Sequence, residues 1–129
     1  MIVVDASSAI ELLLNTAAGV RISARLLASG ETLHAPHLID LEVAQVLRRY
    51  ARPGELDAGR GAQALDDLAD LAINRYPHDV FLPRIWELRH SVTAYDAAYI
   101  ALAEALDAPL VTRDAALASA PHRARVEIV

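Results

Sequence analysis

Short runs of consecutive apolar residues alternate along the chain with longer segments in which apolar residues recur every three or four positions. A continuous run is typical of a strand buried on both faces, and recurrence with a period of 3.6 residues is typical of an amphipathic helix. The continuous runs predict strands at residues 1–4, 33–35, 110–112 and 126–129, the last as an edge strand. The helical pattern predicts helices near residues 9–14, 19–29, 37–51, 65–72, 81–88 and 95–106, with Pro36 opening the third and a short segment near 74–77 following the fourth.

Strands and helices that alternate in this way favour a parallel sheet with helices on both faces. A chain of 129 residues fits one domain, so we expect residues 1–129 to form a single α/β unit. Ligands of such sheets bind beyond the carboxyl ends of the strands. Asp5 directly follows the first predicted strand, and Asp114 lies two positions beyond Thr112 at the end of a later one. Both acids are therefore predicted to lie at the ligand-binding edge.

Two further acids lie at the borders of apolar helices. Glu42 neighbours Leu38 and Val46 on its helix, so its side chain projects from the edge of the apolar stripe. A carboxylate in such a place needs an arginine partner or a metal ion. Asp96 begins a helix that is apolar nearly all round, so we expect it at the rim of a buried element. Asp40 faces elsewhere on the helix of Glu42 and is expected to be a solvated surface charge.

Each of these acids also has an ordinary structural explanation. Asp5 and Asp114 could each cap a following helix, and Asp96 could belong to a capping box that begins at Thr93. Glu42 could form a salt bridge with an arginine. The metal interpretation rests on the shared position of the four acids, because converging carboxylates repel one another and need a cation to stay ionised together. Oxygen ligands favour Mg²⁺ or Mn²⁺, which support hydrolysis of phosphodiester bonds.

The composition and the missing motifs exclude several other kinds of active site. The chain has no cysteine, which excludes a thiolate zinc site and a cysteine nucleophile. The GxSxG, HExxH, P-loop and GxGxxG motifs are absent. His34 and His37 flank Pro36 at a predicted strand–helix junction, so we expect them to be structural or exposed. The net charge of −5 argues against non-specific binding to nucleic acid, although all twelve basic residues are arginine, the better bidentate partner for phosphate.

The sequence offers no signal for secretion or membrane insertion. Its first residues, MIVVDASSAIELLL, carry no basic leader, and acids interrupt the apolar run. No uninterrupted apolar stretch approaches the length of a membrane span. We therefore expect a cytoplasmic protein without membrane association, for which the absence of cysteine is no obstacle.

Four segments, VVDAS, LIDLEVAQVL, TAYDAAYIALA and LVTRD, resemble in order and spacing the acidic motifs of PIN-domain nucleases. The length and the alternation of elements resemble the VapC-type toxins of toxin–antitoxin pairs in particular. The resemblance extends from Asp5 to Asp114. It implies a three-layer α/β/α sandwich with a central, mainly parallel sheet, and a Mg²⁺- or Mn²⁺-dependent endoribonuclease that a cognate antitoxin inhibits.

The resemblance also implies roles for individual residues. Ser7 and Thr112 match hydroxyl positions that help to order the site. The motif positions assign the catalytic, metal-binding acids to Asp5, Glu42, Asp96 and Asp114. Arginines close to the motifs are candidates for steering RNA phosphates, or are solvated helix charges: Arg48, Arg49, Arg89 and Arg113. A homodimer is expected from the apolar helices and the resemblance.

Two other classes of function were compared with a nuclease. A PIN-like fold could be a binding module without turnover, and the four intact acids argue against that. A receiver-like signalling domain also carries an acid after its first strand and a threonine near its last. It needs a lysine after the threonine strand, and this chain contains no lysine.

Overall fold

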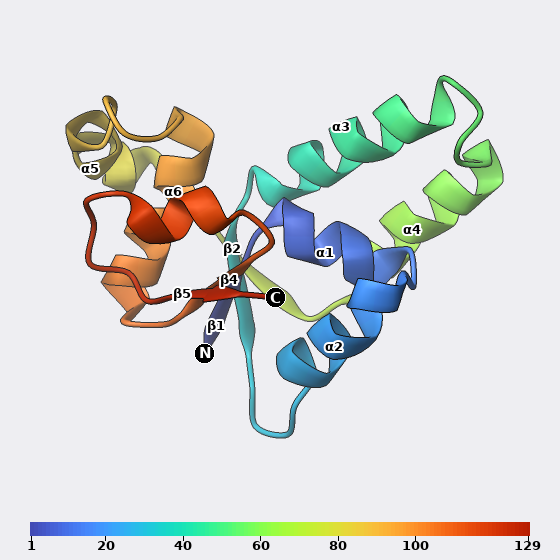
Figure 1. Ribbon diagram of the computed structural model, residues 1–129, viewed down its shortest axis with the longest axis horizontal. Helices are drawn as coiled ribbons and strands as arrows, with labels where there is room; N and C mark the ends of the chain where they lie inside the picture. The colour runs from blue at the N-terminus through green and yellow to red at the C-terminus, as the bar shows by residue number, and fades with distance from the viewer.

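Five short strands form one parallel sheet in the order β3-β2-β1-β4-β5 in the computed structural model, which describes residues 1–129 (Figure 1). The strands are β1 (Ile2–Val4), β2 (Leu33–Pro36), β3 (Ile73–Tyr76), β4 (Leu110–Thr112) and β5 (Val126–Ile128). Every residue of β1, β2 and β4 is buried. Burial on both faces explains why these central strands are encoded by continuous apolar runs and not by alternation.

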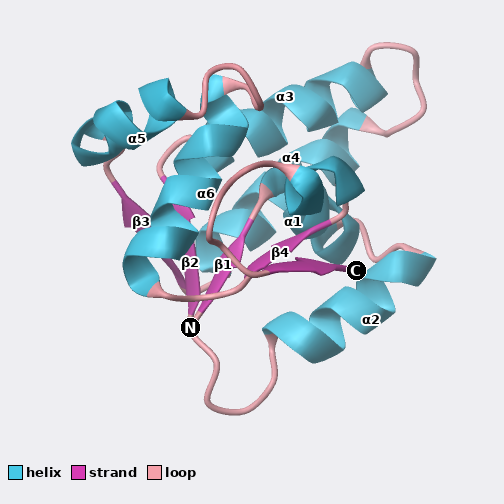
Figure 2. Cartoon of the chain, turned by 60° about the vertical axis from the view of Figure 1, so that its left-hand side comes forward, coloured by secondary structure: helices cyan, strands magenta, loops and turns pink.

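Helices cover both faces of the sheet. One side carries α1 to α4 and the other carries α5 and α6, with the sheet between them (Figure 1). Figure 2 shows the same three layers turned by 60°. The helices are α1 (Ala6–Leu13), α2 (Ala17–Leu26), α3 (Ile39–Ala51), α4 (Ala58–Asp70), α5 (Leu82–Glu87) and α6 (Ala94–Leu106), with short 3₁₀ turns η1 (Asp79–Phe81) and η2 (Ala115–Ser119). The three-layer α/β/α fold expected from the sequence is confirmed, and its sheet is parallel throughout.

The order of the strands fixes where a ligand can bind. The chain runs outward from β1 through β2 to β3 and then crosses back to β4 on the far side of β1. Right-handed crossovers in opposite directions leave their helices on opposite faces. The order therefore reverses between β1 and β4, and in sheets of this kind ligands bind at such a reversal, beyond the carboxyl ends of the strands. Val3 pairs with Leu110 and Val4 with Val111, so Asp5 and Thr112 are neighbours at that edge.

Some boundaries differ from the sequence-based expectation. Pro36 ends β2 and does not open a helix, because α3 begins only at Ile39. The short segment near 74–77 is an edge strand, β3, whose residues after Ile73 are only partly covered. The fourth helix begins well before its apolar positions, at Ala58, where the Asp57 carboxylate accepts a hydrogen bond from the backbone N–H of Arg60.

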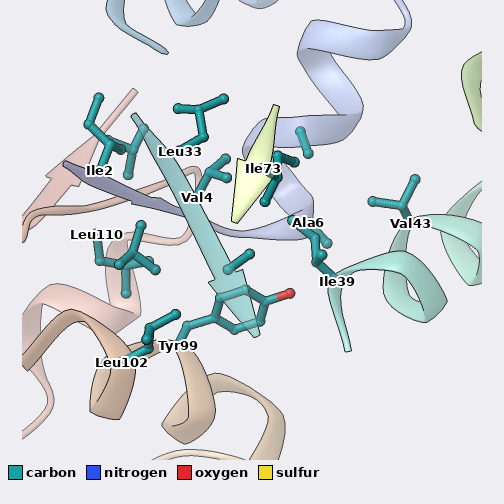
Figure 3. Packing of buried hydrophobic residues seen from close by; sticks show 14 of the residues in the cluster. Ile2, Val4, Ala6, Leu33, Ile39, Val43, Ile73, Tyr99, Leu102 and Leu110 are labelled. Carbon is teal, nitrogen blue, oxygen red and sulfur yellow. The ribbon is translucent and has the colours of Figure 1, made fainter. Parts of the chain in front are cut away.

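The core joins both helical layers to the sheet. Figure 3 shows Tyr99 and Leu102 of α6 beside the strand residues, with Ile39 and Val43 of α3 to the other side. All four belong to a cluster of 27 buried residues. α6 is buried from Ala97 to Ala103, which accounts for its almost wholly apolar sequence. No helix is both long enough and apolar enough to cross a bilayer.

Candidate active site at the carboxyl edge of the sheet

Asp5 is the most firmly held of the predicted acids. It lies between β1 and α1 with only 7% of its surface exposed. Its Oδ1 accepts hydrogen bonds from the Ser7 hydroxyl at 2.7 Å and the Ser8 backbone N–H at 3.1 Å. Its Oδ2 accepts one from the Thr112 hydroxyl at 2.5 Å. Three donors thus compensate for the loss of water around this buried carboxylate.

The hydroxyls beside Asp5 tie β1 to the end of β4. Thr112 is fully buried, and its Oγ1 accepts the backbone N–H of Asp114 at 3.0 Å while its proton goes to Asp5. The Ser7 Oγ accepts the backbone N–H of Arg113 at 3.0 Å. Ser7 and Thr112 therefore fix the loop after β4 relative to Asp5. This ordering is the one that the sequence resemblance implied for the two hydroxyls.

Glu42 is held from the opposite helical layer. The hydroxyl of Tyr99 on α6 donates a 2.7 Å hydrogen bond to Glu42 Oε1 on α3. Burial raises the pKa of Glu42; the Tyr99 hydrogen bond opposes this, and the charges of Asp96 and Asp5 add to it. Tyr99 is 2% exposed, and burial followed by the Glu42 charge raises its pKa, so it stays a neutral donor. The sequence reasoning missed this residue, whose only signal is a hydroxyl in an otherwise apolar helix, three positions after Asp96.

Asp96 lies in the first turn of α6, but it is not the cap of that helix. The cap is Thr93, whose Oγ1 accepts the backbone N–H of Asp96 at 3.1 Å. Burial raises the pKa of the Asp96 carboxyl, and the charges of Asp114 and Asp5 raise it further. Asp114 is exposed and does cap η2, through a 2.9 Å hydrogen bond from Ala116 to its Oδ1. Asp5 and Asp114 therefore both cap a helix, each through its Oδ1. The Oδ2 atom of each residue takes no part in the capping hydrogen bond.

None of the four acids has a basic partner. No salt bridge includes any of them, so the arginine pairing considered for Glu42 does not occur. Six acids elsewhere do form salt bridges, and one of them is Asp40, both oxygens of which accept hydrogen bonds from Arg75 at 2.7 and 2.8 Å. Asp40 was expected to be a solvated surface charge, and 44% of its side chain is exposed. The sequence did not predict its ion pair, because Arg75 comes from β3, which the sequence did not define as a strand.

The pKa shifts of Glu42 and Asp96 show which acids lie close enough to influence them electrostatically. Asp5 and Asp96 both raise the pKa of Glu42, and Asp5 and Asp114 both raise that of Asp96. The charge of Asp5 therefore reaches both Glu42 and Asp96, and the charge of Asp114 reaches Asp96. An open depression of about 490 Å³ adjoins Asp96 and Asp114 and is bordered by Arg89.

The remaining polar candidates lie outside this group. His34 is buried; its ring nitrogens contact the hydroxyls of Thr32 at 2.8 Å and Tyr76 at 2.7 Å, and burial lowers its pKa. His37 is exposed, so the expectation of structural or exposed histidines holds for this pair. Arg48 and Arg49 are exposed on the last turns of α3.

A sequence model of the PIN domain matches residues 2–122 of this chain. The chain belongs to the PIN-domain family. It is 50% identical over 114 residues to ribonuclease VapC9 of Mycobacterium tuberculosis, covering 88% of this chain and 86% of that protein. It is 41% identical over 130 residues to ribonuclease VapC12 of the same organism, covering 100% of this chain and 99% of that one. The resemblance to PIN-domain nucleases of the VapC type is confirmed.

Two solved structures share this PIN-domain fold. VapC20 of Mycobacterium tuberculosis, described as a Sarcin-Ricin loop cleaving toxin, superposes with a TM-score of 0.71 at 18% identity, covering 95% of this chain and 97% of that one. VapBC2 from Rickettsia felis, bound to a DNA fragment from their promoter, gives a TM-score of 0.73 at 15% identity, covering 98% of both chains. At such identities the likeness concerns the fold.

The donor set of this PIN domain fits a hard divalent cation. It consists of carboxylates that lack basic partners. Burial and neighbouring acids raise the pKa of Glu42 and of Asp96, so a cation among these groups would relieve the repulsion. No three His, Asp or Glu side chains form a ready-made cage for a metal ion. A full cage is not required by Mg²⁺, which usually keeps several waters and takes one or two carboxylates together with substrate phosphates.

The raised pKa of Glu42 predicts how stability depends on pH without metal. The Glu42 carboxyl stays protonated to a higher pH in the folded protein than in the unfolded chain. Its contribution to the free energy of unfolding is therefore complete below the unfolded pKa and is lost as the pH rises through the folded pKa. Glu42→Gln keeps an acceptor for Tyr99 and removes the charge. In EDTA the variant should melt no higher than the unmodified protein near pH 4, and at an equal or higher temperature at pH 8.

Thermal melts from pH 4 to pH 8 measure this difference. Asp40→Asn, on the same helix, is the matched control, because its charge is paired with Arg75 and its loss should cost up to about 1 kcal/mol at neutral pH. A Glu42→Gln protein that melts several degrees below the unmodified protein at pH 8 would contradict the charge repulsion deduced for the site.

Proposed function

We propose that this chain is a divalent-metal-dependent endoribonuclease that hydrolyses RNA phosphodiester bonds. The observation that carries the proposal is the group of four carboxylates at the carboxyl edge of the sheet, none of which is paired with a basic residue. The ribonuclease names of its relatives support RNA as the substrate. A binding module without turnover would have no need to hold four mutually repelling charges in one field.

The four acids differ in how firmly the structure holds them, and we assign their roles as metal ligands accordingly. Asp5 would be the fixed ligand, because three hydrogen bonds orient its carboxylate. Glu42 would be a second ligand whose position Tyr99 sets. Asp96 and Asp114 would complete the group at the open side, next to the depression. Mg²⁺ or Mn²⁺, when bound, lowers the pKa of a coordinated water and neutralises charge on the phosphate.

The proposal includes a place in a toxin–antitoxin pair, as the VapC names of the relatives suggest. The toxin would act on RNA in the cytoplasm, form a homodimer and be inhibited by a cognate antitoxin. Large apolar side chains stand exposed on the arm made by α3 and α4, and they supply a surface for such contacts: Leu41, Tyr50 and Leu65. Leu41 directly precedes Glu42, so a segment covering this arm would come close to the acids.

Replacing Asp96 tests the site and the metal requirement together. Cleavage of RNA should require Mg²⁺ or Mn²⁺ and stop in excess EDTA. Asp96→Asn should lower the cleavage rate in Mn²⁺ by roughly a hundredfold or more, the scale of lost charge stabilisation in a transition state. In EDTA the same variant should melt at or above the temperature of the unmodified protein, because burial and neighbouring charges raise the pKa of Asp96.

Asp66→Asn is the matched control, since Asp66 is exposed on α4 and outside the acidic group. It should leave both readouts unchanged. An Asp96→Asn protein that melts several degrees lower yet cleaves at the normal rate would make Asp96 a purely structural acid. Cleavage that persists in EDTA, with contaminating nucleases removed, would defeat the metal-dependent mechanism.

Inhibition by the antitoxin should depend on a cation aimed at the acids. An Arg or Lys of the antitoxin would pair with carboxylates that otherwise lack a basic partner. Neutralising the basic residues of the segment that covers the site should weaken the complex by roughly tenfold or more, measured by calorimetry. Affinity that does not change after every basic residue of that segment is neutralised would contradict this mode of inhibition.

A further inference from the structure

Two large aromatic side chains near the site are exposed and lie outside the core, Trp86 and Tyr95, and Trp86 has the larger ring. Trp86, at the end of α5, is 68% exposed and is not part of the core or of the residues packed against it. Its neighbour Ile85 does pack against the core. An indole ring brings a large apolar area, and its exposure costs free energy unless something covers it. The position of Trp86 therefore needs an explanation other than folding.

Arg89 holds a fixed place against this ring. Its guanidinium carbon lies 4.6 Å from the centroid of the Trp86 ring, and its Nη1 donates a 2.8 Å hydrogen bond to the Trp86 backbone oxygen. Arg89, which follows the end of α5, forms no salt bridge, whereas Arg84 within α5 pairs with two glutamates. The pair thus presents an aromatic face and an uncompensated positive charge, held together and open to solvent.

The pair stands at the rim of the acidic site. Arg89 borders the depression of about 490 Å³ that also reaches Asp96 and Asp114. A chain that places a phosphate near these acids would therefore pass Arg89 with an adjoining nucleotide. The arrangement combines what unpaired bases require, a flat aromatic surface for the base and a cation for the phosphate beside it.

We propose that Trp86 and Arg89 form a stacking site for one unpaired base of the RNA substrate, next to the bond that is cut. Arg89 covers one side of the indole, and the base stacks on the part of the ring that stays open. The site takes bases of any identity, because every base has an aromatic face, and it selects single-stranded or loop RNA over duplex. This inference rests on the proposed ribonuclease function and adds to it the two residues that would hold one base of the substrate.

Trp86 is the only tryptophan of the chain, so its fluorescence reports on the stacked base directly. A mixed-sequence single-stranded RNA dodecamer, added in EDTA to prevent cleavage, should quench the emission of the unmodified protein with saturation. The blunt duplex of the same sequence should quench it far less. Anisotropy of the labelled dodecamer should show binding weakened roughly five- to 150-fold in Trp86→Ala, the loss expected for one stacked base.

Matched variants separate stacking from charge. Leu82→Ala removes another exposed apolar side chain from α5 and should bind RNA normally. Trp86→Phe should restore part of the affinity lost in Trp86→Ala. Trp86→Ala should keep the salt dependence of binding, whereas Arg89→Ala should reduce its slope by about one unit. With Mn²⁺ present, Trp86→Ala should raise the KM for the dodecamer and leave kcat within about twofold.

The outcomes distinguish this inference from the function on which it rests. One outcome would overturn the stacking site alone: RNA is cleaved in Mn²⁺ and binds without changing the tryptophan emission, and Trp86→Ala is as active as the unmodified protein. Quenching by RNA without any cleavage in Mn²⁺ would support the stacking site and defeat the nuclease. Sedimentation that shows Trp86→Ala to be monomeric and the unmodified protein dimeric would assign Trp86 to a protein interface and overturn the stacking site.

Discussion

The carboxylate of Asp5 lies between β1 and α1, almost out of contact with water. Three hydrogen bonds compensate for the water that it has lost. That requirement shapes its surroundings. Thr112 must be buried at the end of β4 to reach one oxygen, and Ser7 and Ser8 must begin α1 to reach the other. The parallel pairing of β1 with β4 brings these groups together from opposite ends of the chain. The reversal in strand order then leaves the space above them open.

The other acids add charge to a place already negative. Glu42 and Asp96 come from the two helical layers, α3 and α6. Burial is the main cause of their raised pKa values, and the charge of Asp5 adds to both. Some acids elsewhere are paired with arginine, as Glu31 and Glu127 are with Arg25. At the carboxyl edge, Glu42 and Asp96 are half-buried, have raised pKa values and lack a basic partner. A structure that retains such repulsion has a use for a cation there, and Mg²⁺ or Mn²⁺ suits the oxygen ligands.

The sequence predicts most of this arrangement, for identifiable reasons. Buried central strands are continuous apolar runs, so their carboxyl ends locate Asp5 and Asp114 without a structure. The pairing of Asp40 with Arg75 could not be predicted, because it joins residues 35 positions apart through an edge strand with little apolar signal. The contact between Tyr99 and Glu42 was equally hidden, since a tyrosine in an apolar helix is expected in the core in any case. Long-range side-chain partners are set by packing, which the hydrophobic pattern does not specify.

Equilibrium binding of Mn²⁺, followed by electron paramagnetic resonance at neutral pH without RNA, tests the central claim most directly. The account predicts saturable binding by the unmodified protein that is lost or greatly weakened in Asp5→Asn and in Glu42→Gln. It predicts unchanged binding in Asp40→Asn, whose carboxylate lies on the same helix as Glu42 but is paired with Arg75. Mn²⁺ binding that survives both Asp5→Asn and Glu42→Gln undiminished would contradict the assignment of a metal site to these acids.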